Sequence, residues 1–139
     1  MEGRVLPSLQ IKQGVMNMAT EITAHKAVLN GGVTIDATNK VYTLQDEATA
    51  FVEMNIDGKL ILIAQNTDDL KDAKVIINAG KYWQNIYGDL EVTVEKSETA
   101  IIGPFESAWF GDIEETSKKQ VINIEVKTAT CKIYAIQIP

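Results

Sequence analysis

The sequence holds few of the residues on which enzyme and metal sites depend. Its 139 residues include one cysteine, Cys131, and one histidine, His25. A histidine-rich metal site is therefore excluded, and a catalytic dyad or triad would have to use His25. Cys131 lies within an apolar run, which predicts a small buried side chain rather than a reactive thiol. We expect no catalytic residues, no metal and no cofactor, and hence a protein that is not an enzyme.

Basic side chains and long apolar segments are also scarce. Arg4 is the only arginine among 13 basic residues, and the net charge is −6. Nucleic acids are bound by basic surfaces, so we expect no nucleic-acid partner. No run approaches the roughly 18 apolar residues of a membrane span, and the start of the chain lacks the apolar core of a signal peptide. We therefore expect no membrane partner, and synthesis in a reducing cytoplasm.

The first 17 residues do not have the pattern of a regular element. Their apolar residues follow no clean period, and Pro7 and Gly14 would interrupt any long helix. We predict an N-terminal arm or extension over residues 1–17, followed by one folded domain over residues 18–139. The arm is expected to bury its apolar side chains on another subunit or on a larger assembly. Its candidate interface residues are Leu6, Leu9 and Ile11.

The second half of the chain has the pattern of short strands. Leu90, Val92 and Val94 alternate with polar residues, as in a strand with one buried face. The run that follows Asp57 and Gly58 is continuously apolar, which is typical of a strand covered on both faces. The expected strands are 57–66, 73–80, 89–95, 98–103, 121–127 and 130–138.

The spacing of these strands predicts their pairing and the fold. Two residues separate 89–95 from 98–103, which is close enough for a tight hairpin, and 130–138 is expected to pair back on 121–127. Short strands divided by turns favour a sandwich or a barrel. We predict an all-β fold, a single antiparallel β-sandwich of jelly-roll or immunoglobulin-like type. Residues 20–32 are expected to hold a turn or two of helix.

Two groups of carboxylates resemble binding or catalytic sites only superficially. Asp68, Asp69 and Asp72 cluster in one turn, but their spacing matches no calcium loop, so a solvated polar turn is expected. Glu91 and Glu95 have the same parity on one strand, which places both on its exposed face, where charges are ordinary. Neither group predicts a metal ion or a pair of catalytic carboxylates.

Two aromatic groups are the best candidates for binding. The segment 100–110, AIIGPFESAWF, sets Phe105, Trp109 and Phe110 beside a Gly-Pro turn, and three rings in so short a segment cannot all enter one small core. We therefore expect at least one of them at an interface with another protein or another subunit. The second group, which could close the core, contact a partner or stack on a sugar, is Tyr82, Trp83 and Tyr87.

Residues 57–139 also resemble a known family. The chain is similar there to the small accessory head proteins of tailed bacteriophages, and it departs from them in its N-terminal extension, in Trp109 where a basic residue is expected, and in the longer turn 114–120. The resemblance implies a β-sandwich capsid decoration protein. The matching residues are Gly88, Asp89, Leu90, Val92, Val94, Thr99, Gly103, Pro104, Phe105, Glu106, Ser107, Phe110 and Pro139.

Two functions follow as hypotheses. The first is a virion structural protein on the capsid exterior, which binds the major capsid protein and stabilises the shell. Such a protein would gain avidity by forming a homo-oligomer, and the three-fold positions of capsid lattices suggest a trimer. The alternative is a carbohydrate-binding β-sandwich module that uses the aromatic loop residues for adhesion.

Overall fold

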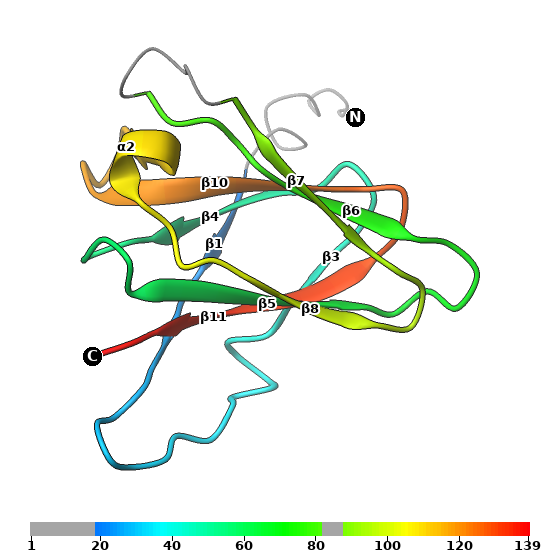
Figure 1. The fold of residues 1–139 in the computed structure, drawn as a ribbon, viewed down its shortest axis with the longest axis horizontal. Coiled ribbons are helices and arrows are strands. Elements are labelled where there is room, and N and C mark those ends of the chain that lie inside the picture. The colour runs from blue at the N-terminus through cyan, green and yellow to red at the C-terminus, as the bar shows by residue number, and fades with distance from the viewer. Residues whose placement is uncertain (1–18, 82–87) are drawn as a thin grey trace, which may run out of the picture.

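The protein is a β-sandwich (Figure 1). A computed structural model describes residues 19–81 and 88–139. Two sheets pack face to face, and the fold class predicted from the sequence is confirmed. The predicted arm, residues 1–17, lies outside the described residues. The elements are β1 (Thr20–Ile22), β2 (His25–Lys26), β3 (Tyr42–Leu44), β4 (Thr49–Glu53), β5 (Leu60–Asn66), β6 (Ala73–Ile77), β7 (Leu90–Val94), β8 (Thr99–Ile102), α2 (Ser107–Phe110), β9 (Gly111–Ile113), β10 (Gln120–Lys127) and β11 (Cys131–Gln137).

Each sheet is built around a long central strand. The sheet that we call the β10 sheet has the order β1-β4-β10-β6-β7, with β9 also paired to β10. The β5 sheet has the order β2-β11-β5-β8, with β3 paired to β11. Most pairs are antiparallel, as predicted, but β1 runs parallel to β4 and β2 runs parallel to β11. Each of these short N-terminal strands extends one sheet.

The expected strands are all present, but the expected helix is not. Residues 20–26 form β1 and β2 instead of a helical turn. The reason is visible in their burial: the side chains of Ile22 and His25 are buried, whereas their neighbours Glu21 and Lys26 remain exposed. Edge pairing to β4 and β11 provides this segment with backbone hydrogen bonds that its own sequence pattern does not reveal.

The two predicted hairpins are wrong, because the strands of each predicted pair belong to different sheets. β7 pairs with β6 while β8 pairs with β5, and β10 and β11 likewise separate. The turn between β7 and β8 is bound instead to the loop that precedes β6. The N–H of Lys96 donates to Asp72 Oδ1 at 3.1 Å, and the N–H of Ser97 donates to the Asp68 carbonyl at 3.0 Å. These bonds help hold the connection between the two sheets.

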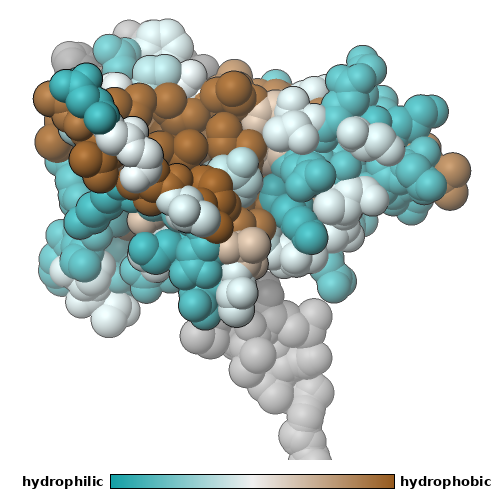
Figure 2. Space-filling view, turned by 90° about the horizontal axis from the view of Figure 1, so that it is seen from below, coloured by the Kyte–Doolittle hydropathy of each residue, from teal (hydrophilic) through white to brown (hydrophobic). Residues whose placement is uncertain are grey.

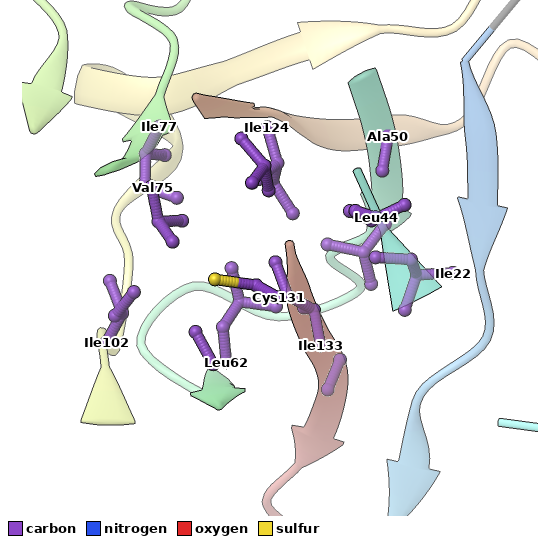
Figure 3. Packing of buried hydrophobic residues seen from close by; sticks show 14 of the residues in the cluster. Ile22, Leu44, Ala50, Leu62, Val75, Ile77, Ile102, Ile124, Cys131 and Ile133 are labelled. Atoms are coloured by element: carbon purple, nitrogen blue, oxygen red, sulfur yellow. The ribbon is translucent and has the colours of Figure 1, made fainter. Parts of the chain in front are cut away.

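The core lies between the sheets and is aliphatic. Figure 3 shows Ile124 and Val75 of the β10 sheet facing Leu62, Cys131 and Ile133 of the β5 sheet. All five side chains have no exposed surface. Burying each such aliphatic side chain contributes about 1.5–3 kcal/mol, so this layer is the main source of stability.

The strand β5 is fully covered on one face only, whereas the sequence predicts cover on both faces. Leu60, Leu62 and Ala64 are fully buried, but the alternate residues Ile61 and Ile63 are only half-buried. The continuous apolar run therefore does not mean that the described chain covers both faces of the strand. Its second face is partly open.

Cys131 is expected to be unreactive in the native protein. Burial in the core raises the pKa of its thiol from 9.0 to about 11, so almost no thiolate forms at neutral pH. We predict that a disulfide reagent added at pH 7.5 leaves the folded protein unmodified but labels the thiol within minutes in guanidinium chloride. Absorbance of the released leaving group measures both reactions. Rapid labelling of the folded protein would contradict the buried position.

Candidate functional site

One end of the sandwich carries a cluster of aromatic and apolar side chains. It lies where β8 leads through α2 into β9, and it surrounds an open depression of about 530 Å³. We call this surface the aromatic corner. In Figure 1, α2 marks its position at the end of the sandwich where β5 begins. The corner is lined by Gly58, Leu90, Pro104, Phe105, Glu106, Trp109 and Phe110.

The three rings of the corner have different environments. Phe105 is 1% exposed and belongs to the core. Its prediction as an interface residue is therefore wrong for the isolated chain, because almost none of its side chain can contact a partner. Phe110 is half-buried and packs edge-on against Phe105, with 5.9 Å between the ring centroids. Trp109 is 41% exposed and lies 6.2 Å from Phe110. The rings therefore form a series from core to surface, and Trp109 is the one that presents most area to a partner.

The turn between β4 and β5 fixes the start of α2. The carboxylate of Asp57 accepts hydrogen bonds from the N–H of Ser107 at 3.3 Å and from its hydroxyl at 2.9 Å. The N–H of Gly58 donates to the Phe105 carbonyl at 2.8 Å. A four-residue helix has little stability of its own, so these contacts from a distant turn determine its position.

The segment after β6 fixes the other end of α2. The N–H of Gly80 donates to the Trp109 carbonyl at 2.8 Å, and the N–H of Lys81 donates to the Gly111 carbonyl at 2.9 Å. The two backbones approach so closely that a Cβ at Gly80 would lie 2.5 Å from the Gly111 carbonyl oxygen. Only glycine fits at position 80, and the backbone of Trp109 is held in place as a result.

The sequence pattern does not reveal Leu90 as a residue of the corner or Asp57 as a residue that supports it. Leu90 was assigned to a buried face, but it begins β7 at the edge of the β10 sheet and is 37% exposed. Asp57 precedes Gly58, and Asp-Gly is typical of a hairpin turn, but β4 and β5 lie in different sheets and the Asp57 carboxylate binds Ser107. Only the position of an edge strand and a long-range hydrogen bond reveal these roles. Other sequence candidates lie outside the described residues: Leu6, Leu9, Ile11, Tyr82, Trp83 and Tyr87.

The titratable residues that the sequence singled out have structural roles. His25 is buried; its Nδ1 lies 3.2 Å from the Ala135 carbonyl, and its Nε2 accepts the N–H of Asp36 at 2.8 Å. The Asp68 carboxylate accepts two backbone N–H groups of its own turn, those of Leu70 and Lys71. Within residues 19–81 and 88–139, no group of three or more His, Cys, Asp or Glu side chains could hold a metal ion.

Comparisons with protein-family models, curated proteins and solved structures find no match for this chain. The part of the chain described by the structure contains no helix that is long and apolar enough to cross a membrane.

The exposed side chains of the aromatic corner are mainly apolar, which suits contact with another molecule. Exposed Trp109, Pro104 and Leu90 offer apolar area, and the exposed Glu106 adds one negative charge at its border.

Proposed function

We propose that this chain is a non-catalytic virion structural protein, a capsid decoration or head accessory protein of a tailed bacteriophage. It binds the major capsid protein on the outside of the shell and stabilises the shell. The observation that carries the proposal is the aromatic corner, in which an exposed tryptophan is fixed to a rigid sandwich from two sides. Large aromatic side chains held in this way are the usual anchors of protein interfaces.

The resemblance to phage head proteins supports the proposal through residues that build this corner. Gly103 and Pro104 turn the chain out of β8, Phe105 enters the core, and Ser107 binds Asp57. Asp89 accepts the N–H of Ala79 at 2.6 Å near the other side of the corner. The residues that carry the resemblance therefore build the scaffold of the corner in this chain. The tryptophan, where the family pattern has a basic residue, is this chain's own contact residue.

The distribution of charge also supports attachment through one surface. The outer face of the β10 sheet carries exposed ion pairs, among them Lys74–Glu91 at 3.8 Å and Lys119–Glu53 at 3.5 Å. Surface pairs of this kind add little stability, but they keep the face hydrated. In the decorated particle this face remains in solvent, and the aromatic corner contacts the shell.

Carbohydrate binding is the alternative function. Tyr82, Trp83 and Tyr87 lie outside the described residues. Trp109 offers an exposed ring in a depression that Glu106 also lines, and this arrangement suits stacking on a pyranose and hydrogen bonding to its hydroxyls. Shell binding and glycan binding are therefore measured with the same variants.

Replacing Trp109 with alanine is expected to weaken binding to capsid shells by at least about 30-fold, as for a central interface tryptophan. The probe is empty shells assembled from the major capsid protein of a phage that encodes this chain, and bound protein is measured by co-sedimentation. The matched control is Leu70→Ala. Leu70 is 80% exposed, but it lies in the β5–β6 loop at the opposite end of the sandwich, so this variant should bind normally.

The same proteins are then applied to a glycan array. Shell binding that is lost with Trp109→Ala and retained with Leu70→Ala, without glycan binding, supports the capsid function. Glycan binding that depends on Trp109, without affinity for shells, would replace it with the alternative. Equal shell binding by all three proteins would show that the aromatic corner is not the contact surface.

A further inference from the structure

The outer face of the β5 sheet is apolar over two of its rows. The paired rows on this face are Ile136 with Ile61, and Tyr134 with Ile63 and Ile101. Ile101 is 73% exposed on the edge strand β8. The next row is polar: Lys132, Gln65 and Thr99. Figure 2 looks onto this side of the molecule from below and shows apolar surface, in brown, gathered over one part of it.

The loop between β2 and β3 adds to this apolar surface. Val28, Leu29, Val33 and Ile35 are all exposed, and Leu29 is the most exposed of them at 76%. Val28, Val33 and Ile35 border a small slot of about 140 Å³ between the loop and the sheet, which His25 and Ile136 also line. In Figure 1 the loop projects below the β5 sheet, so it forms one wall of the face.

Hydrogen bonds fix this loop to the sheet. The N–H of Ala27 donates to the Gln137 carbonyl at 2.9 Å, and the N–H of Asp36 donates to His25 Nε2 at 2.8 Å. The carboxylate of Asp36 in turn accepts the N–H groups of Thr38 and Asn39. The apolar wall is therefore preorganised, which lowers the conformational entropy lost when a partner binds.

We propose that the outer face of the β5 sheet, with the loop beside it, binds the same face of a second copy of this chain. Three observations select this partner. The first is charge. The chain has a net charge of −6, so two copies repel each other, and the outer face of the other sheet carries charged side chains of both signs. The two apolar rows described above contain no charged side chain, so two copies approach there at the lowest electrostatic cost.

The second observation is the sequence of β5. Strands that are apolar on both faces are ordinarily covered on both faces. The β10 sheet covers one face of β5 through Leu62 and Ala64, while Ile61 and Ile63 on the other face remain half-buried. A second sheet packed at about 10 Å would complete the burial of this strand in the usual way.

The third observation is size. With a strand spacing of about 4.8 Å and a rise of about 3.4 Å per residue, the seven-residue strands β11 and β5 cover roughly 10 by 24 Å, and the shorter β8 and β2 extend this area on either side. The exposed apolar side chains of the loop enlarge the face further, toward the roughly 800 Å² per partner that a standard interface buries. A single patch that packs on itself forms a two-fold contact, so the expected assembly is a dimer, in place of the trimer suggested by lattice symmetry.

Ile101→Lys tests the proposal, because it places a charge in an apolar row of the face, on a side chain of the edge strand β8 that the fold leaves exposed. We expect wild-type protein to sediment with twice the 15.3 kDa mass of one chain. The dissociation constant of Ile101→Lys should be about 100-fold higher, since two lysines would have to be desolvated. Leu29→Asp tests the loop in the same way. The matched control is Ile113→Lys, at an exposed isoleucine of the β10 sheet.

Thermal unfolding separates loss of pairing from loss of folding. The midpoint of a dimer rises with protein concentration, so wild type and Ile113→Lys should show this dependence, and Ile101→Lys should unfold cooperatively without it. A monomeric or trimeric wild-type protein would overturn the proposal, as would equal weakening by Ile113→Lys. None of these measurements uses capsid shells, so their outcome is independent of the proposed capsid function.

Discussion

Replacing Phe105 with alanine is expected to lower the free energy of unfolding by about 3–5 kcal/mol, which is the usual cost of removing a buried phenylalanine. The ring is 1% exposed, and its removal leaves a cavity beneath Phe110, whose ring packs edge-on against it. For a domain of this size the loss corresponds to a thermal midpoint lower by at least about 10 °C. Urea denaturation followed by circular dichroism measures the change.

Leu70→Ala is the control for this substitution. The Leu70 side chain is exposed in a loop, so the free energy of unfolding of this variant should stay within about 0.5 kcal/mol of the wild-type value. The comparison distinguishes a core role from a contact role. A Phe105→Ala protein with unchanged stability and reduced shell affinity would mean that the ring belongs to an interface, as the sequence alone suggested.

Gly80→Ala is expected to destabilise the protein by about 3 kcal/mol, the upper range for overpacking a rigid site. The new Cβ would lie 2.5 Å from the Gly111 carbonyl oxygen and 2.7 Å from the Gly111 nitrogen, and neither backbone atom can rotate away. The segment must separate from α2, which breaks the bond from Gly80 to the Trp109 carbonyl. We therefore expect lower stability in urea and weaker shell binding together.

Gly32→Ala provides a matched control. A Cβ at Gly32 meets no atom within 4 Å, so this substitution should leave stability unchanged or raise it slightly by restricting the unfolded chain. If both variants behaved alike, the close approach of the two backbones would not be the cause. If Gly80→Ala lost stability but kept full shell affinity, the position of Trp109 would not depend on this contact.

The strands of the second half could be predicted from the sequence because each carries its own signal. In β10, Ile122, Ile124 and Val126 alternate with Asn123 and Glu125, and the structure buries the first set while leaving the second half-buried. A period of two depends only on neighbouring residues and on one buried face. Short strands such as β1 and β3 span too few residues to show it.

The pairing of strands could not be predicted in the same way. The two residues between 89–95 and 98–103 suit a hairpin, yet the turn is held by Asp68 and Asp72, which are more than 20 positions away. Nothing local distinguishes a turn within one sheet from a turn between two sheets. The residues that bind this turn lie in the loop before β6, and only folding brings that loop and the turn together.

The sequence predicts the aromatic corner only in part. Three rings in one short segment indicated a surplus of apolar surface, and Trp109 is exposed as this surplus requires. Which ring enters the core depends on the path of the backbone between Gly103 and Gly111. That path is set by contacts from Asp57 and Gly80, both distant in sequence, so Phe105 could not be distinguished from Trp109 in advance.

The alternation of strands between sheets has a consequence for how the molecule forms. Among the described strands, β6 with β7 and β9 with β10 are pairs of consecutive strands, but the central pairs of both sheets join distant parts of the chain. β5 meets β11, and β4 meets β10, only after loops of more than 60 residues have closed. Loop closure of this kind is slow, so both layers should appear together in one late, cooperative step. A nascent chain would stay incomplete until its last strand, Cys131–Gln137, has been synthesised.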